Sequence, residues 1–480
     1  MIKNTRTLPF WLFTFSVIMV LVVSQLLQDG VFMDGMLYIS VSKNLADGLG
    51  TFWNPHFSLT SMSDFHEQPP LYFGLLALFY KLFGTSMYVE RLFCLLCYTI
   101  TAFFIHKLWK VIFESETEMA KNSWLPVLFW STIPVCFWAY ANHVEETVMA
   151  VFTTISVYYM YCAIFKKQRI VFNLVLAGIF IFLSSLTKGV QGMFPVAGAV
   201  FYFMVFRTIS FRKMILYSLL LVGVPLVIYG MLMITNANVY LSFKKYFEIR
   251  LLGTFANKGA TTDTHFDLLA RLFMELLPAA ALTALLLFFT RKQKAHDRIT
   301  SNHYKTILWF LFMGLSGSLP LMVTLEQRGF YLVTSFPLFA IGIAMWLAPR
   351  LTQWTERINL LSPTFKLTKI LSIVLLAATT AFSIMQVGHT KRDNDLLSDV
   401  YAIGKIVPHG DIINMPDDMW NDWSLREYLI RNFYISTDKC CNQPHTFFII
   451  RKDLPKNLIP DYYQPYSLPT KEVDLYFEKE

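Results

Sequence analysis

Two acidic motifs near the start of the sequence contain residues that could transfer protons. Asp34 lies in the segment MDGMLYISVSKNLADGLG, and Glu67 lies in DFHEQPPLYF between His66 and Gln68. A carboxylate can take a proton from an attacking hydroxyl group, so Asp34 is a candidate general base and Glu67 a second catalytic candidate. The apolar residues after Asp34 have helical spacing, which predicts a short interfacial helix that starts there. The alternative hypothesis is that Asp34 only caps this helix.

A second set of ionisable residues lies at the ends of long apolar runs. Arginine can fork onto phosphate oxygens and lysine acts as a compact charge, so basic residues in such places could contact a phosphate. The candidates for phosphate contact are Arg91, Lys188 and Arg328. The candidates for contact with a sugar or an acceptor are His66, Gln68, Glu145, Glu146, His265 and Tyr331. The alternatives are that Lys188 only snorkels from its span and that the two glutamates only favour a helix N-terminus.

His265 and Glu67 raise the question of a metal. Imidazole and carboxylate are ordinary zinc ligands, but two ligands are fewer than a zinc site needs. The preferred interpretation of His265 is an interfacial or substrate-contacting residue, and a divalent metal held with Glu67 is the alternative. The sequence has no P-loop and no GxGxxG after a strand, so it predicts no nucleotide pocket and requires no cofactor.

The composition predicts an integral membrane protein. Of 480 residues, 55% are hydrophobic and only 15% are charged, and the mean hydropathy is +0.45. The net charge of +8 comes from short clusters between apolar runs. Basic loops between spans orient a membrane protein, so the charge indicates topology rather than binding to nucleic acid.

About eleven transmembrane helices follow from roughly 20 apolar residues per span and basic residues on the cytoplasmic side. They are predicted near residues 8–27, 88–111, 123–140, 144–165, 170–186, 190–206, 214–235, 267–289, 306–325, 331–347 and 367–387. The first run lacks a signal-peptide cleavage site and is expected to remain. Residues 28–88 then form a first outer loop. Within it, residues 69–83 are expected to lie along the outer interface rather than to cross, because another span would move the basic clusters outside.

The tail, residues 389–480, has a polar composition typical of a small soluble domain. Short apolar runs in DIIN and HTFFII predict strands, and a helix is expected over residues 425–433, which together indicate an α/β domain outside the membrane. The predicted organisation is thus a transmembrane domain over residues 1–388 and a C-terminal extracytoplasmic domain over 389–480. Adjacent Cys440 and Cys441 are expected to be loop thiols or to bond elsewhere, because bonding each other would close a strained ring.

Six blocks of the sequence carry a resemblance to a known family. The blocks are MDGMLYISVSKNLADGLGTFWNP, HEQPPLYF, YVERLF, NHVEETVMAVF, LTKGVQGMFP and EQRGFYLVTSFP. In this order they resemble bacterial members of glycosyltransferase family 39, which are similar to protein O-mannosyltransferases and lipid A aminoarabinose transferases. The resemblance covers nearly the whole membrane portion and weakens over the tail. It implies the GT-C fold, a sugar donor linked to polyprenyl phosphate, and inverting transfer to an acceptor hydroxyl on the outer face.

The resemblance also implies roles for single residues. Asp34 matches the acid of the family's first outer loop and is therefore the expected general base, while the arginines and lysine named above match positions expected to contact phosphate. Two departures stand out. Gly35 stands where family members often have a second acid, so any role of that acid is absent here or belongs to another residue. Gln68 stands where some aminoarabinose transferases have lysine, which makes that substrate less expected.

The function predicted from the sequence is therefore glycosyl transfer at the outer face of a bacterial inner membrane. The partners would be the lipid-linked donor, the bilayer, and a glycolipid, lipid A, polysaccharide or protein acceptor. Two alternatives remain: a polyprenyl-lipid transporter or flippase, and a non-catalytic lipid-binding subunit, neither of which needs Asp34 as a base. The sequence does not specify the donor sugar, the acceptor, the carrier length or the oligomeric state.

Overall fold

The computed structural model describes residues 6–255, 259–293, 300–440 and 443–479. The chain divides into two compact units. Unit 1 consists of residues 1–27, 94–141 and 145–387, and unit 2 consists of residues 28–93, 142–144 and 388–480.

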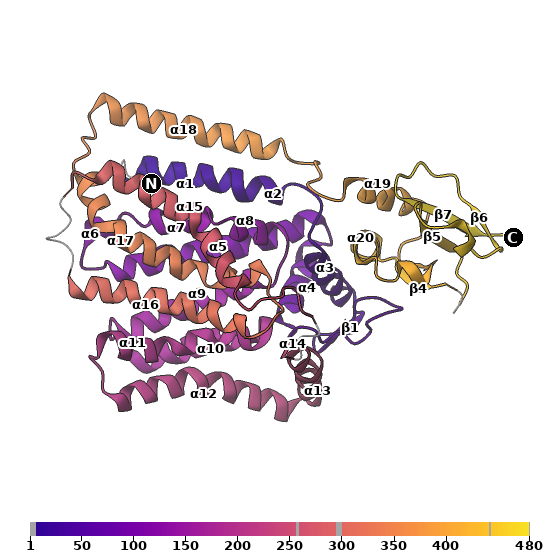
Figure 1. The fold of residues 1–480 in the computed structure, drawn as a ribbon, viewed down its shortest axis with the longest axis horizontal. Helices are drawn as coiled ribbons and strands as arrows, with labels where there is room; N and C mark the ends of the chain where they lie inside the picture. The colour runs from indigo at the N-terminus through magenta and orange to yellow at the C-terminus, as the bar shows by residue number, and fades with distance from the viewer. Residues whose placement is uncertain (1–5, 256–258, 294–299, 441–442, 480) are drawn as a thin grey trace. The chain divides into compact units, whose positions relative to one another are not determined.

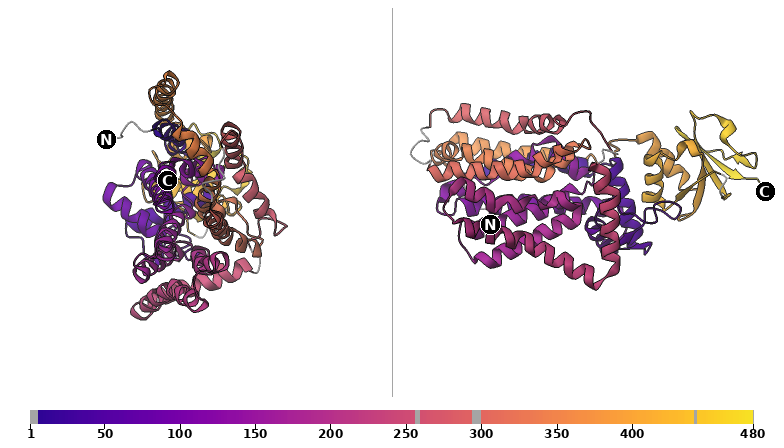
Figure 2. Two further views of the ribbon diagram at one scale, coloured as in Figure 1. Left: turned by 90° about the vertical axis from the view of Figure 1, so that its left-hand side faces the viewer. Right: turned by 60° about the horizontal axis from the view of Figure 1, so that its bottom comes forward.

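Unit 1 is built from long apolar helices that run along one common direction. They are seen from the side in Figure 1 and nearly end-on in the left view of Figure 2. Its elements are α1 (Leu8–Ile18), η1 (Met19–Val23), α2 (Ser24–Leu26), α5 (Met87–Ile112, which begins in unit 2), α6 (Thr117–Ala120), α7 (Trp124–Ser131), α8 (Pro134–Ala141), α9 (Glu146–Ile164), α10 (Ile170–Lys188), η2 (Gly189–Ala197), α11 (Gly198–Phe206), α12 (Phe211–Thr235), α13 (Ala237–Lys245), η3 (Tyr246–Leu251), α14 (Leu252–Phe255), α15 (Asp267–Thr290), α16 (Ser301–Ser318), η5 (Leu319–Val323), η6 (Gly329–Thr334), α17 (Phe336–Glu356) and α18 (Pro363–Ile384).

Eight helices among the described residues are long and apolar enough to cross a membrane. A ninth candidate is the pair that includes α7 and α8, which is bent by 75°. These helices differ in how far the rest of the protein covers them: 83% of the apolar window of α9 is buried, but only 11% of that of α12. An all-round apolar helix that is exposed needs a hydrocarbon environment, so the chain is a multi-pass membrane protein. The number of spans remains a prediction.

The chain reverses direction after α10, as the sequence predicted for residues 170–186 and 190–206. A Cβ added to Gly192 would lie 2.5 Å from the backbone of Ser184. In one straight helix these residues would be about 12 Å apart along the axis. Therefore η2 folds back against α10, and Gly192 allows the close approach because it has no side chain.

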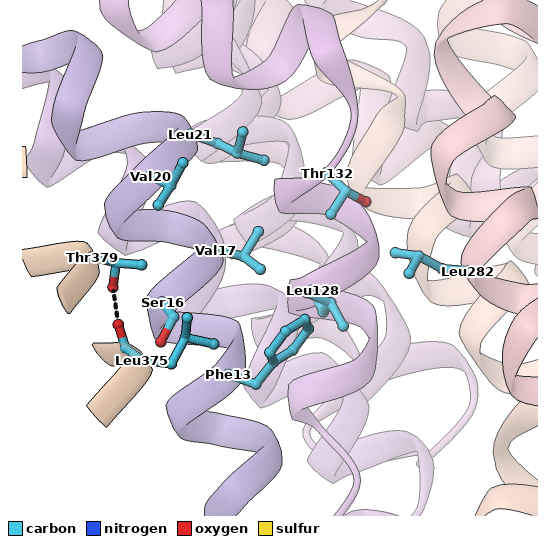
Figure 3. A pocket seen from close by; sticks show the side chains of 10 residues that line it. All are labelled: Phe13, Ser16, Val17, Val20, Leu21, Leu128, Thr132, Leu282, Leu375 and Thr379. Carbon is cyan, nitrogen blue, oxygen red and sulfur yellow. Dashed lines mark hydrogen bonds between the residues drawn. The ribbon is translucent and has the colours of Figure 1, made fainter. Parts of the chain in front are cut away.

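An apolar cavity of about 380 Å³ lies between α1, η1, α7, α15 and α18 (Figure 3). Its hydroxyl groups donate to carbonyls of their own helices, as Ser16 does to Leu12 at 2.9 Å and Thr379 to Leu375 at 2.9 Å. The cavity therefore offers hydrocarbon surface only. It cannot recognise a sugar or a phosphate, and its chemistry suits a lipid tail.

Unit 2 combines the first outer loop with the C-terminal tail. The loop contains α3 (Met33–Ala46), the antiparallel strands β1 (Gly50–Thr51) and β2 (Asn54–Pro55), and α4 (Leu71–Phe83). The helix predicted to start near Asp34 is confirmed as α3. The helix α4 has 13 residues, which gives a length of about 20 Å and is too short to cross about 30 Å of hydrocarbon.

The tail forms the predicted α/β domain. Its five-stranded sheet has the order β4-β3-β5-β7-β6, with β3 parallel to β4 and β5 and with β7 antiparallel to β5 and β6. The elements are α19 (Asn394–Ile403), β3 (Ile412–Met415), η7 (Asp417–Met419), α20 (Trp423–Phe433), β4 (Ser436–Lys439), β5 (Phe447–Arg451), η8 (Lys456–Leu458), β6 (Tyr463–Pro465) and β7 (Val473–Glu478). The predicted strands in DIIN and HTFFII are confirmed as β3 and β5, and the predicted helix is confirmed as α20. Cys440 takes part in a disulfide bond rather than being a loop thiol, and Cys441 lies outside the described residues.

Buried ion pairs join the outer loop to the tail within unit 2. The Arg431 guanidinium on α20 donates to Glu90 Oε2 at 2.9 Å and to Asp29 Oδ1 at 3.0 Å. Tyr401 donates to Asp29 Oδ2 at 2.7 Å, and Tyr80 donates to Glu90 Oε1 at 3.0 Å. The outer loop therefore packs as one body with the tail, whereas the predicted domain organisation grouped it with the transmembrane helices.

Candidate active site

Asp34 lies in the first turn of α3, where it is half-buried. The N-cap residue is Phe32, whose backbone N–H donates to Asn142 Oδ1 at 2.9 Å. The hypothesis that Asp34 is the capping residue is therefore wrong. A carboxylate in the first turn is still stabilised by the helix dipole, which favours its ionised form.

Gly35 fixes the position of the helix that carries Asp34. A Cβ at this position would lie 1.9 Å from the backbone oxygen of Asn142, much closer than any real contact. Only glycine allows α3 to approach Asn142 this closely. Any larger residue, including a second acid, would push the first turn of α3 and its carboxylate away.

The residues around Glu67 are held by their own loop. Nε2 of buried His66 lies 2.6 Å from Asp64 Oδ1 and 3.0 Å from Asn54 Oδ1. Gln68 is buried, whereas Glu67 is exposed. The contacts of His66 make it a structural residue of the loop, and its contact with a substrate remains a prediction, as do the roles of Glu67 and Gln68.

Arg91 is buried and holds the beginning of the outer loop. Its Nη2 donates to the carbonyl oxygens of Gln28 at 3.1 Å and Gly30 at 3.5 Å. These contacts tie the start of α5 to the segment that leads into α3. The predicted contact of Arg91 with phosphate is not tested by this arrangement.

In unit 1, Lys188 lies at the C-terminal end of α10 in a buried acidic environment. Its Nζ is 2.5 Å from Glu146 Oε1 and 4.0 Å from Glu145 Oε2. The side chain of Lys188 is 7% exposed, and those of both glutamates are fully buried. A lysine that snorkels keeps its ammonium group in water, so that alternative for Lys188 is wrong.

An aromatic residue and a second ion pair extend this cluster. The ammonium group of Lys188 lies 4.8 Å from the centroid of the Tyr331 ring. The Tyr331 hydroxyl donates to Glu326 Oε1 at 3.0 Å, and Glu326 also pairs with Arg250 and accepts from Thr254 at 3.1 Å. We call Lys188, Glu145, Glu146, Tyr331, Glu326 and Arg250 the lysine cluster.

Gly189 explains how the segment after α12 reaches the lysine cluster. Its φ is +68°, and a Cβ there would meet the Tyr246 hydroxyl at 2.0 Å. Tyr246 begins η3, which also carries Arg250. A glycine after Lys188 is therefore required by both its backbone conformation and the packing of η3.

The last two predicted residues have exposed side chains in unit 1. Arg328 is exposed at the N-cap of η6. His265 is exposed, and its Nδ1 lies 2.7 Å from the carbonyl oxygen of Met322. Among the residues that the structure describes, no group of three or more His, Cys, Asp or Glu side chains could hold a metal ion.

Comparisons with known proteins agree with this architecture. Residues 67–234 match the model of the family described as dolichyl-phosphate-mannose-protein mannosyltransferase. ArnT from Cupriavidus metallidurans bound to undecaprenyl phosphate superposes with a TM-score of 0.64 at 13% identity, covering 96% of each chain. The chain has the GT-C fold. The apo state of the same ArnT gives a TM-score of 0.64 at 14% identity and 95% coverage of each chain. No curated protein sequence matches the chain.

Within this GT-C chain the predicted site residues form two groups. Unit 2 holds Asp34 together with His66, Glu67, Gln68 and Arg91, and unit 1 holds the lysine cluster, His265 and Arg328. The first group offers a carboxylate for proton transfer, and the second offers cations and hydrogen-bonding groups.

Proposed function

We propose that the protein is a membrane glycosyltransferase that moves a sugar from a polyprenyl-phosphate carrier to an acceptor hydroxyl. The reaction inverts the anomeric carbon and uses Asp34 as the general base. The acceptor is a glycolipid, lipid A, a polysaccharide or a protein. The observation that carries this proposal is the position of Asp34: a half-buried carboxylate in the first turn of a helix that Gly35 and Asn142 fix in place.

The proposed reaction balances with the groups that the chain supplies. Asp34 accepts the proton of the acceptor hydroxyl, and the resulting nucleophile attacks the anomeric carbon from the face opposite the phosphate. The bond between that carbon and the phosphate oxygen breaks, and polyprenyl phosphate leaves with the bonding electrons. Positive side chains stabilise the charge on the leaving phosphate, for which Arg328 and Lys188 are the first candidates in unit 1.

The comparisons support the proposed donor. The family model that matches residues 67–234 is named for enzymes that use a mannose linked to dolichyl phosphate. The ArnT structure with the same fold binds undecaprenyl phosphate. The basic clusters between spans support an orientation with the outer loop and the tail on the extracytoplasmic side of the bacterial inner membrane.

The test compares Asp34→Asn with Asp47→Asn, which changes an exposed acid at the other end of the same helix. Binding of undecaprenyl phosphate to the purified protein in nanodiscs is measured by native mass spectrometry. Transfer is measured by mass spectrometry of cell-envelope glycans and glycoproteins from cells that carry each variant or lack the gene. We expect Asp34→Asn to bind the lipid but lose transfer by about 100-fold or more, and Asp47→Asn to retain both.

Each alternative gives a different result. A flippase would continue to move the lipid across the membrane in the Asp34→Asn variant. A non-catalytic subunit would show the same glycan profile in the wild type and in the Asp34→Asn variant. The leaving phosphate can be stabilised by the chain's own cations, so we also propose that no divalent metal is required, and transfer that is lost after EDTA treatment and restored by a metal would contradict this.

A further inference from the structure

The short segment between α8 and α9 holds the first turn of α3. Residues 142–144 belong to unit 2, although the helices on either side of them belong to unit 1. The side chain of Asn142 is 3% exposed, and its Oδ1 accepts a hydrogen bond from the N–H of Phe32 at 2.9 Å. Phe32 is the N-cap of α3 and lies two residues before Asp34. This hydrogen bond therefore fixes the backbone directly before the proposed base.

The backbone of Asn142 makes a second contact with α3, after Asp34. A Cβ on Gly35 would lie 1.9 Å from the Asn142 carbonyl oxygen, so the two backbones are in direct contact. The helical hydrogen bond from the Met36 N–H to the Phe32 carbonyl oxygen, at 3.0 Å, closes the turn between the two contact points. Asn142 thus contacts the residue two positions before Asp34 and the residue directly after it. A shift of Asn142 would displace the carboxylate.

The residue after Asn142 has a strained backbone. The φ of His143 is +57°, in the left-handed region that residues with a side chain rarely adopt. His143 is also fully buried. Strained residues of this kind persist only where the surrounding structure determines their conformation, and they cluster at functional sites. The packing around His143 therefore imposes its conformation, and with it the position of Asn142.

Tyr72 of α4 is part of this packing. Its hydroxyl oxygen lies 3.2 Å from His143 Nδ1, which is within hydrogen-bonding distance. Tyr72 is fully buried, and the centroid of its ring lies 5.8 Å from that of Tyr38 on α3 and 5.8 Å from that of Phe93 on α5, with the rings edge-on. The contacts form a closed circuit within unit 2: α3 contacts Asn142, His143 contacts α4, and α4 contacts α3.

His143 makes this contact as a neutral imidazole. Burial lowers the pKa of His143 well below its usual range, and the positive charges of Arg91, Arg431 and Lys391 lower it further. A neutral imidazole has one donor and one acceptor nitrogen, so His143 can pair with a hydroxyl group without a change of charge. The contact with Tyr72 is therefore independent of pH near neutrality.

We propose that Asn142 and His143 are positioning residues for the base Asp34. The hydrogen bond with Tyr72 holds His143 and thereby Asn142, and Asn142 holds the first turn of α3. A general base acts only within hydrogen-bond reach of the acceptor hydroxyl, and a displacement of about 1 Å can lower the rate about 100-fold. The catalytic consequence rests on the proposed function, whereas the anchoring of α3 does not.

Hydrogen exchange of the full-length protein in nanodiscs, measured by mass spectrometry, tests the anchoring directly. The Phe32 N–H precedes the helical hydrogen bonds of α3, so its protection depends on Asn142 Oδ1. In Asn142→Ala we expect peptides within residues 29–37 to exchange about fivefold faster or more, as the loss of one buried hydrogen bond implies. The control is Asn44→Ala, which removes a similarly buried amide near the other end of α3 and should leave these peptides unchanged.

Tyr72→Phe tests the link through His143. It removes one oxygen atom and keeps the buried ring. Peptides within residues 29–37 should again exchange faster, because His143 no longer holds Asn142. The control is Tyr88→Phe, which changes an exposed tyrosine at the start of α5 and should exchange as the wild type does. If Asn142→Ala does not elute as the wild type does in size-exclusion chromatography, Tyr72→Phe decides the test.

Sugar transfer, measured by mass spectrometry of cell-envelope glycans and glycoproteins, tests the catalytic consequence. Asn142→Ala should lower transfer about tenfold or more and still bind undecaprenyl phosphate, because it displaces the base and leaves the carrier site intact. A positioning residue acts through Asp34, so adding Asn142→Ala to Asp34→Asn should lower the residual transfer no further. A general loss of folding would lower transfer in both backgrounds.

The outcomes separate this inference from the proposed function. Exchange of residues 29–37 at the wild-type rate in Asn142→Ala, or in Tyr72→Phe, would overturn the inference. If both variants exchange faster but the wild type transfers no sugar, the anchoring stands and the proposed function fails. If the wild type is active and Asn142→Ala transfers sugar equally well, or lowers transfer by the same factor with and without Asp34, the inference fails alone.

Discussion

Replacing Asp29 by Asn should destabilise unit 2, because Asp29 is one of the two carboxylates that neutralise buried Arg431. The Asp29 carboxylate accepts from Arg431 at 3.0 Å and from Tyr401 at 2.7 Å. Burial alone would raise its pKa, but the Arg431 charge and the hydrogen bonds from Tyr401, Arg431 and the Gly30 backbone lower it from 3.8 to about 2. The native contacts therefore favour the ionised form of Asp29.

The size of the effect follows from this difference in pKa. At about 1.4 kcal/mol per pKa unit, the lowering of the Asp29 pKa from 3.8 to about 2 corresponds to about 2.5 kcal/mol of unfolding free energy. For a cooperative unit of this size the Asn variant should lose about 5–10 °C in Tm. The folded-state pKa lies below the unfolded-state value, so the contribution is complete above pH 3.8 and is lost only as the pH falls toward 2.

The assay is thermal unfolding of the purified protein in nanodiscs, followed by tryptophan fluorescence at pH 5.5 and at pH 7.5. Asp29→Asn should lower Tm by the same amount at both values. The matched control is Asp395→Asn, which removes an exposed partner of Lys471 and should leave Tm unchanged. The reasoning is refuted if Asp29→Asn unfolds at the wild-type temperature, or if the loss appears at only one of the two pH values.

Two further substitutions test the positions of the site residues. Gly35→Ala should destabilise the protein by about 1–3 kcal/mol and reduce transfer, because the new Cβ would overlap the Asn142 backbone. The control is Gly223→Ala, where the added Cβ meets nothing within 4 Å. Equal Tm values for the two variants would contradict the argument. Lys188→Met should lower the free energy of unfolding by about 3–5 kcal/mol, because it removes the cation beside two buried glutamates. Thermal unfolding compares it with Lys121→Met, which breaks an ion pair on the surface. A small loss of stability in both variants would show that Glu145 and Glu146 do not depend on Lys188.

Local sequence patterns predicted those helices and strands whose formation depends mainly on residues close to one another in the sequence. The helix after Asp34 and the helix at residues 425–433 follow from apolar spacing, and both are present as α3 and α20. The strands in DIIN and HTFFII are short apolar runs between turn residues, which a buried parallel strand requires. The reversal after α10 was also predictable, because the TKG segment places a glycine where two apolar runs meet.

Contacts between distant segments were not predictable from one sequence. Arg431 pairs with Asp29 across 402 residues and with Glu90 across 341 residues. No local pattern marks these partners, because a buried ion pair is defined by tertiary packing and each member alone resembles a surface charge. For the same reason the sequence grouped the outer loop with the membrane helices, whereas the structure packs it with the tail.

The buried lysine cluster changes the order of the candidates for phosphate contact. Lys188 was predicted as a phosphate ligand, but its ammonium group faces two buried glutamates at 2.5 Å and 4.0 Å. A phosphate placed beside Lys188 would therefore have to share its ammonium group with two buried glutamate side chains. Arg328 is exposed and makes no ion pair with the residues that the structure describes, so its planar guanidinium is available for two hydrogen bonds to phosphate oxygens. The contacts in unit 1 thus rank Arg328 ahead of Lys188 among the candidates for the leaving phosphate, and the role of each residue remains a prediction.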